Sequence, residues 1–125
     1  MVKTFVSILV ALALVLGVSV YEFYAVERAF NTFRTALISL YKKTEREEAS
    51  HEDGAVVRNV WQKQRSALNF WLPHTELETI DYQLNEAIGY IYTKDYDNVL
   101  PKLEILLGLC ESIPKGYAIG WGNIF

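Results

Sequence analysis

The feature that most constrains this chain is a run of uncharged residues near its amino terminus. From Thr4 to Tyr21 there are 18 residues without Asp, Glu, Lys or Arg, and most are Val, Leu, Ile or Ala. As an α-helix this run is about 27 Å long, close to the ~30 Å hydrocarbon core of a bilayer. It predicts a transmembrane helix with residues 4–23 in the bilayer, which makes residues 1–24 an anchor. Tyr21 and Tyr24 are of the type enriched at membrane interfaces.

The charges that flank this run predict its orientation. Lys3 precedes it, and Glu22 and Glu27 are the first charged residues after it. Since basic residues are enriched on the cytoplasmic side, this pattern favours a cytoplasmic amino terminus and an extracytoplasmic domain. Basic residues that begin at Arg28 reduce the asymmetry. The predicted localisation is the cell membrane, in a single pass.

A cleaved signal peptide is the alternative to an anchor. Gly17-Val18-Ser19 supplies small residues of the kind found at cleavage sites, and a secreted helical domain would then remain. Against cleavage, the run is long for a signal peptide, and neither Gly nor Pro interrupts the helical pattern from Gly17 to Gly54. The sequence therefore favours the anchor.

Composition restricts the remaining residues, 25–125, to one folded domain. The chain has 125 residues, of which 51% are hydrophobic and 14% aromatic, too apolar for a disordered segment. A net charge of -3 argues against a nucleic-acid partner, which requires a basic face. The stretch 28–65 is basic and 76–111 is acidic, so two halves that face each other would attract; a basic patch on anionic lipid is the alternative.

Hydrophobic periodicity predicts an all-α fold in which the transmembrane helix continues into a small bundle of three to four helices. A stripe at spacings of four and three supports the first of these helices, and breakers such as Gly54 and Pro73 separate the others. The predicted helices span residues 25–48, 55–71, 75–93 and 98–113. The stripe consists of Val26, Phe30, Phe33, Leu37, Leu40 and Thr44. The helix over 75–93 has an apolar face with a 3.6-residue period, made of Leu77, Ile80, Leu84, Ala87, Ile88 and Ile91.

Pro114 is predicted to end the last helix and to leave residues 114–125 as an irregular apolar tail. The tail contains Tyr117, Trp121 and Phe125, which favour packing across the bundle to complete its core. Insertion of the tail into a partner or into the membrane interface is the alternative.

The arrangement resembles the bacterial domain-of-unknown-function family 4363, found mainly in Gram-positive bacteria. The resemblance covers nearly the whole chain, and its most distinctive element is the closing Asn123-Ile124-Phe125. It implies a membrane-anchored helical protein and assigns no activity. The other elements are the amino-terminal apolar helix, the Trp61–Trp71 helix, His74 with Glu76 and Ile80, Tyr90-Ile91 leading to Lys94-Asp95, and the Leu-rich helix to Ile113.

The residues that carry chemistry are sparse. His51 and His74 occur without an HExxH motif or a cysteine pair, and Cys110 is the single cysteine, so neither a metal site nor an intrachain disulfide is predicted. No glycine-rich phosphate loop or G-x-S-x-G motif is present. We expect no enzyme, no catalytic residue and no cofactor.

Two functions of different classes follow. The first is a non-enzymatic accessory or scaffold subunit that binds another membrane protein, or a second copy of itself, beside the lipid bilayer. The second is a small module that binds or senses a ligand or lipid between its helices, for which a small bundle has little spare volume. We favour the first. The expected interaction surface is Phe30, Phe33, Leu37, Tyr117, Trp121 and Phe125.

Overall fold

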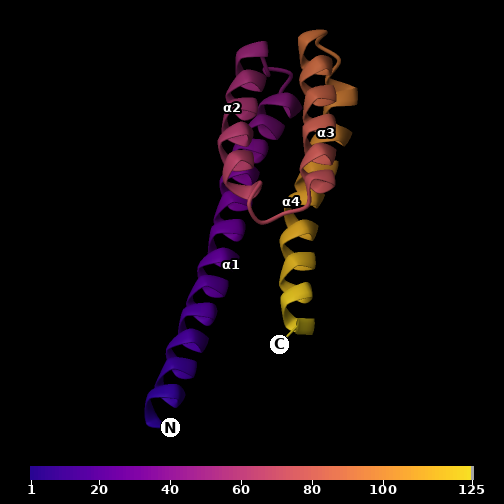
Figure 1. Cartoon of the computed structure of the whole chain (residues 1–125). Coiled ribbons are helices and arrows are strands. Elements are labelled where there is room, and N and C mark those ends of the chain that lie inside the picture. Colours follow the sequence, from indigo (N-terminus) through magenta and orange to yellow (C-terminus); the bar gives the residue numbers. More distant parts are fainter. Residues whose placement is uncertain (125) are drawn as a thin grey trace.

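The computed structural model describes the backbone of residues 1–124 and the side chains of residues 1–116 (Figure 1). Over these residues the chain is helical, without strands, and the predicted all-α class is confirmed. The long first helix, α1, has 44 residues and is about 66 Å long. The four helices are α1 (Val2–Glu45), α2 (His51–Leu68), α3 (His74–Tyr92) and α4 (Tyr96–Ile124).

Successive helices run in opposite directions and form an up-down-up-down bundle, the expected result of short connections. α1 packs on α2 and α4, and α3 packs on α4 and α2, so the order around the bundle is α2, α1, α4, α3. The first half of α1 projects beyond the bundle, and the end of α4 projects in the same direction (Figure 1). Two ends can therefore be distinguished: a near end, from which α1 projects, and a far end.

The core consists of the stripes that the periodicity predicted. All six residues of the α1 stripe are buried, from Val26 at 1% exposure to Thr44, whose hydroxyl donates to the Leu40 carbonyl over 2.8 Å. The predicted face of α3 is also fully buried. The α3 residues are Leu77, Ile80, Leu84, Ala87, Ile88 and Ile91.

The predicted attraction between the basic and acidic halves has a local form. Asp81 of α3 accepts hydrogen bonds from Trp61 Nε1 at 2.6 Å and from Arg65 Nε at 2.9 Å, both on α2. Tyr41 of α1 donates to Glu104 of α4 over 3.0 Å. These bonds cross between the α1–α2 and α3–α4 hairpins.

Both far-end turns use a residue in the left-handed region without a glycine. Glu47 has φ 56° and Lys94 has φ 58°. After α1, the Glu48 amide donates to the Lys43 carbonyl over 2.9 Å, and the Glu47 amide donates to Thr44 over 3.0 Å. This pair of bonds is a Schellman motif, and the turn at Lys94 repeats it.

The helix starts differ from the predicted ones. α2 begins at His51 rather than at residue 55, because Ser50 and Asp53 form a capping box that the pattern analysis missed. α3 begins at His74, one residue before the predicted start, with Pro73 at its N-cap and no side-chain cap hydrogen bond. Pro73 has φ -57° and ψ 141°, the extended backbone typical of an N-cap residue.

The predicted irregular tail is wrong for residues 114–124, which continue α4 to Ile124. Pro114 removes one backbone hydrogen bond and crowds the preceding turn, but it need not end a helix whose other bonds form. Lys115 Nζ pairs with Glu111 Oε1 at 3.2 Å across the proline. The side chains of Tyr117 and Trp121 and the whole of Phe125 lie outside the described part of the chain, so their expected packing on the core stays a prediction.

Trp61 is the largest fully buried side chain, and it contacts Phe33 with ring centroids 4.7 Å apart. We expect Trp61→Ala to lower the free energy of unfolding by about 3–5 kcal/mol, because it removes both the buried ring and the bond to Asp81. Phe70→Ala is the matched control, since Phe70 is 86% exposed. Denaturant unfolding followed by circular dichroism measures both variants, and equal losses would contradict the assignment of the core.

Asp53 predicts a pH dependence of stability. The hydrogen bond from Lys43, and then that from the Ser50 amide, hold the pKa of the Asp53 carboxyl below its ordinary value of 3.8. A lowered pKa stabilises the fold above pH 3.8, and this contribution is lost as the pH falls through the folded-state value. Asp53→Asn should therefore be less stable than the parent at pH 7, with a gap that narrows below pH 3.8. Urea unfolding at several pH values tests this; a gap that does not change with pH would refute it.

Candidate functional site on the outer face of α1

The residues considered for metal or acid–base chemistry are not brought together. His51 packs edge-on against Tyr92 with ring centroids 5.0 Å apart, at the far end of the bundle. His74 lies at the near end, with Nε2 3.2 Å from Glu78 Oε1. Among the residues that the structure describes, no three His, Cys, Asp or Glu side chains form a cluster able to hold a metal ion.

Cys110 is a core residue. Its side chain is 5% exposed, and burial raises the pKa of the thiol to about 12. The thiol is therefore protonated at neutral pH, and a protonated, buried thiol is a poor nucleophile.

A polar hollow of about 540 Å³ lies between α2 and α3. The Trp61, Arg65 and Asp81 groups in it bond to one another, and Arg58 Nη2 donates to Asn85 Oδ1 over 3.2 Å. Since these groups satisfy each other across the two helices, their first role is to hold α2 against α3.

Three of the six residues expected at an interaction surface are buried. Phe30, Phe33 and Leu37 are 1%, 0% and 0% exposed, so they pack inside the bundle and present no surface to a partner. The heptad stripe that indicated an intermolecular contact is used within the chain, because α2 and α4 flank α1 along it. The other three expected residues, Tyr117, Trp121 and Phe125, lie outside the described side chains.

A hollow of about 690 Å³ lies where α1 enters the bundle. Small residues of α1 and α2 form part of its lining, including Gly17, Ala25 and Ala67. Arg28 and Gln64 add polar groups at the end that lies within the bundle. The complete lining is Gly17, Val20, Tyr21, Tyr24, Ala25, Arg28, Ala29, Thr32, Gln64 and Ala67.

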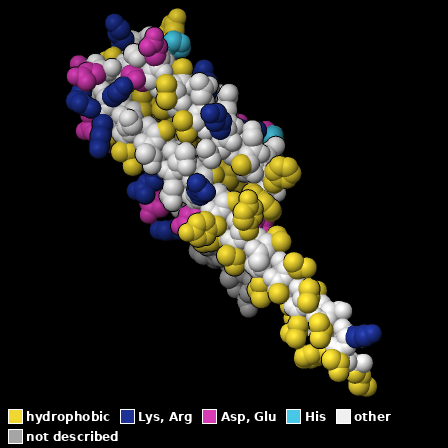
Figure 2. Space-filling model, turned by 90° about the vertical axis from the view of Figure 1, so that its left-hand side faces the viewer, with side chains coloured by type: hydrophobic (Ala, Val, Ile, Leu, Met, Phe, Trp, Pro, Cys, Tyr) yellow, Lys and Arg dark blue, Asp and Glu magenta, His cyan; other side chains and the backbone are white. Residues whose placement is uncertain are grey.

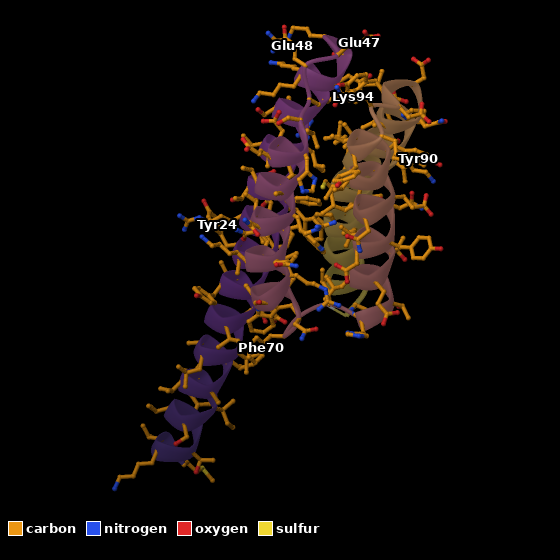
Figure 3. All side chains as sticks on the ribbon, turned by 90° about the horizontal axis from the view of Figure 1, so that it is seen from above. Tyr24, Glu47, Glu48, Phe70, Tyr90 and Lys94 are labelled. Atoms are coloured by element: carbon orange, nitrogen blue, oxygen red, sulfur yellow. The ribbon has the colours of Figure 1, made fainter. Side chains whose placement is uncertain are left out.

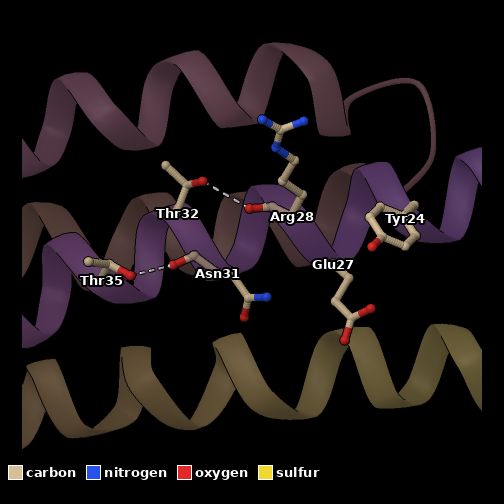
Figure 4. Close-up of a pocket in the computed structure, with 6 residues that line it drawn as sticks. All are labelled: Tyr24, Glu27, Arg28, Asn31, Thr32 and Thr35. Carbon is tan, nitrogen blue, oxygen red and sulfur yellow. Dashed lines mark hydrogen bonds between the residues drawn. The ribbon is translucent and has the colours of Figure 1, made fainter.

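A second hollow of about 590 Å³ lies on the adjoining side of α1 and shares Tyr24, Arg28 and Thr32 with the first (Figure 4). Arg28 leaves α1 toward α2, whereas Glu27 leaves it toward α4 (Figure 4). The hydroxyl of Thr32 donates to the Arg28 carbonyl over 2.9 Å, and that of Thr35 donates to Asn31 over 2.9 Å.

The outer face of α1 from Gly17 to Thr35 is therefore the candidate site. It is a continuous surface that changes from apolar at Gly17 and Val20 to polar at Arg28 and Asn31. Within the described side chains, no ion pair engages Glu27 or Arg28. The arrangement suits association with a surface that is itself apolar at one end and polar at the other.

This face was not predicted from the sequence, because the apolar stripe on the other side of α1 carries the stronger periodic signal. The signal for this face was present opposite that stripe, where Tyr24, Arg28, Thr32 and Thr35 recur at spacings of four and three. Such polar periodicity is usual for a solvated helix face, so the sequence alone does not distinguish a binding surface from one in water.

The family model described as "Domain of unknown function (DUF4363)" matches residues 21–124, and the chain belongs to this family. The expected resemblance is thereby confirmed. Comparisons with curated proteins and with solved structures give no match. The matched range begins where the uncharged run ends and includes all of α4, so the bundle with its α4 extension forms the family's unit.

Proposed function

We propose that this protein is a membrane-anchored, non-enzymatic accessory subunit that binds another membrane protein along the outer face of α1. The observation that carries the proposal is the continuity of α1. One helix passes from an exposed apolar segment into a bundle that buries one apolar stripe of its second half. A partner that contacts both parts would fix the position of the domain relative to the membrane and its rotation about the axis of α1.

Exposure of the apolar segment supports the anchor. α1 is long and apolar enough to cross a membrane, and its most apolar stretch of 18 residues is 0% buried in the bundle. The apolar core helix of a soluble protein would instead be buried. Figure 2 shows hydrophobic side chains around this segment, in contrast to the many charges on the bundle. A surface of this kind in water would favour aggregation, whereas lipid would cover it.

The lining of the α1–α2 hollow supports a protein partner. Without a strong hydrophobic drive inside lipid, helices associate through close packing at small residues and through interhelical hydrogen bonds. Gly17 and Ala25 allow close approach at one end of the hollow, and Arg28 and Gln64 offer hydrogen bonds at the other. A transmembrane helix that continues into a polar segment matches this order.

A ligand-binding module has less support. The apolar side chains of the bundle interior form one contiguous cluster, and the hollows on the described surface are open to solvent or lipid rather than enclosed. Small-molecule sites usually bury most of their ligand. A lipid bound in the α1–α2 hollow would be detected as lipid adducts when a photoreactive residue is placed in the lining.

The proposed orientation places the amino terminus in the cytoplasm and the bundle outside it, based on Lys3 before the apolar run and Glu22 and Glu27 after it. In intact cells, a membrane-impermeant maleimide should label Tyr92→Cys, since Tyr92 is 70% exposed at the far end. Labelling only after lysis would reverse the orientation. A mature chain whose mass lacks the first 19 or so residues would instead indicate signal-peptide cleavage and refute the anchor.

A photoreactive residue tests the partner surface. At Gln64, which lines the hollow, it should crosslink to one membrane protein in native membranes. At Tyr82, which is 68% exposed on α3, it should give no such product. A product of twice the 14.3 kDa mass would identify a second copy as the partner, and lipid adducts alone would refute a protein partner.

A substitution in the lining of the hollow tests the same surface, and a substitution of α1 outside the lining is its matched control. Gly17→Leu fills space in the hollow, and a Cβ at Gly17 meets nothing within 4 Å, so the fold should tolerate it. We expect loss of the Gln64 crosslink. Ala11→Leu adds similar bulk to α1 away from the lining and should preserve the crosslink. Equal crosslinking in both variants would exclude this face.

A further inference from the structure

We infer that the α2–α3 connection is a second membrane contact, in which Phe70 enters the interface of the bilayer that α1 crosses. This inference rests on the anchoring part of the proposed function and adds a surface that the accessory role does not require. Its basis is the position, exposure and charge of residues 66–75 at the near end of the bundle.

The position follows from the helix directions. α2 runs back along α1 toward its apolar segment, and the connection to α3 lies at the near end (Figure 1). Ala67 lines the same hollow as Tyr21, Tyr24 and Arg28, so the end of α2 lies alongside this part of α1, about one turn before Phe70. Tyr21 and Tyr24, each 69% exposed, lie where the apolar run ends. Phe70 is therefore close to the depth expected for the bilayer interface.

The local structure holds Phe70 outward. The side chains of Leu68 and Leu72, on either side of it, are 1% and 7% exposed, while that of Phe70 is 86% exposed. The amides of Trp71 and Leu72 both donate to the Leu68 carbonyl, at 2.9 Å and 3.0 Å. Because these hydrogen bonds fix the backbone and both leucines are buried, the local structure holds the Phe70 ring on the surface. Half-buried Trp71 lies beside it, with ring centroids 6.5 Å apart.

The charge distribution separates the two ends of the bundle. Ser66–Thr75 contains no Asp, Glu, Lys or Arg over ten residues. The far-end connections instead carry Glu45 to Glu48, Lys94 and Asp95. Figure 3 shows Phe70 at one end of the bundle and Glu47, Glu48 and Lys94 at the other. An uncharged aromatic loop is suited to the membrane interface, where Trp and other amphipathic rings are enriched.

Continuity with α1 and α4 identifies the occupant as a bilayer rather than a second protein. α1 leaves the bundle at this end, and α4 extends past Ile113 in the same direction by about 16 Å. The α4 sequence from Tyr117 to Ile124 carries no charged residue. Three uncharged segments therefore lie at this end of the bundle: the apolar run of α1, residues 66–75 and the α4 residues 117–124. All three are compatible with contact to a bilayer, and the anchor holds this end of the bundle close to one.

Site-directed spin labelling of the full chain in phosphatidylcholine–phosphatidylglycerol vesicles tests the inference. The label is placed at Asn69→Cys, which leaves Phe70 intact, at Tyr92→Cys on the far end and at Val10→Cys in the apolar run. Cys110 need not be removed because it is buried, and the parent chain provides the labelling control. We expect the spin label to collide with a water-soluble nickel reagent several-fold less often at residue 69 than at residue 92. Collision with oxygen, which partitions into lipid, should be more frequent at residue 69 than at residue 92.

The variants distinguish a membrane contact from a merely structured loop. In the Asn69→Cys chain, Phe70→Glu should raise nickel collision toward the level at 92, whereas Phe70→Leu should keep the protection. If the label at residue 69 collides with nickel as often as the label at residue 92, while the label at residue 10 is protected, the α2–α3 connection does not contact the membrane and the anchor stands. High collision at Val10 as well would refute the anchor itself. Dipolar broadening at 69 that disappears on dilution with unlabelled chain would overturn the inference in favour of self-association.

Discussion

The structure depends on α1 remaining one helix while its surroundings change. Before Val26 the apolar side chains are largely exposed; from Val26 on, those of the stripe are 5% exposed or less. The two halves share one run of backbone hydrogen bonds, so the rotation of the first half fixes that of the second. Phe30, Phe33 and Leu37 on the second half lie in the core of the bundle. The apolar segment is therefore continuous with the fold, and no flexible linker separates it from the bundle within α1.

The other three helices complete a bundle whose ends differ. At the far end, Schellman turns at Glu47 and Lys94 and the Ser50–Asp53 capping box present polar groups, with Lys43 Nζ 2.7 Å from Asp53 Oδ1. At the near end, a connection without charged residues displays Phe70. Since each end joins helices by a short loop, the difference comes from residue type and not from topology. This asymmetry is consistent with the proposed contact between the near end and a bilayer.

Hydrophobic periodicity predicted the core because burial repeats with the helix itself. Val26 to Thr44 and the face of α3 were identified residue by residue. The predictions failed at positions where other interactions outweigh a local sequence preference. Glu47 and Lys94 adopt the left-handed conformation that usually indicates glycine, and Pro114 lies inside a helix that it was expected to end. Phe30, Phe33 and Leu37 were expected at an interaction surface and are buried, because a stripe that packs within a chain and one that packs between chains have the same spacing. Only the position of α2 and α4 decides between them.

α4 continues beyond Pro114, and the proposed membrane anchor gives a physical reason for this. A proline within a helix costs ~3 kcal/mol or more in water, and glycines such as Gly116 add to the cost. Unwinding would relieve it there, since water can bond the freed groups. In or beside lipid the balance is reversed, because each unbonded backbone group costs several kcal/mol and a helix satisfies nearly all of them. The proposed anchor would place this part of α4, which projects at the same end of the bundle as the apolar half of α1, beside the bilayer, where a helix that continues through Pro114 to Ile124 is favoured. The same proposal thus accounts for residues 114–124, which the sequence pattern predicted as an irregular tail.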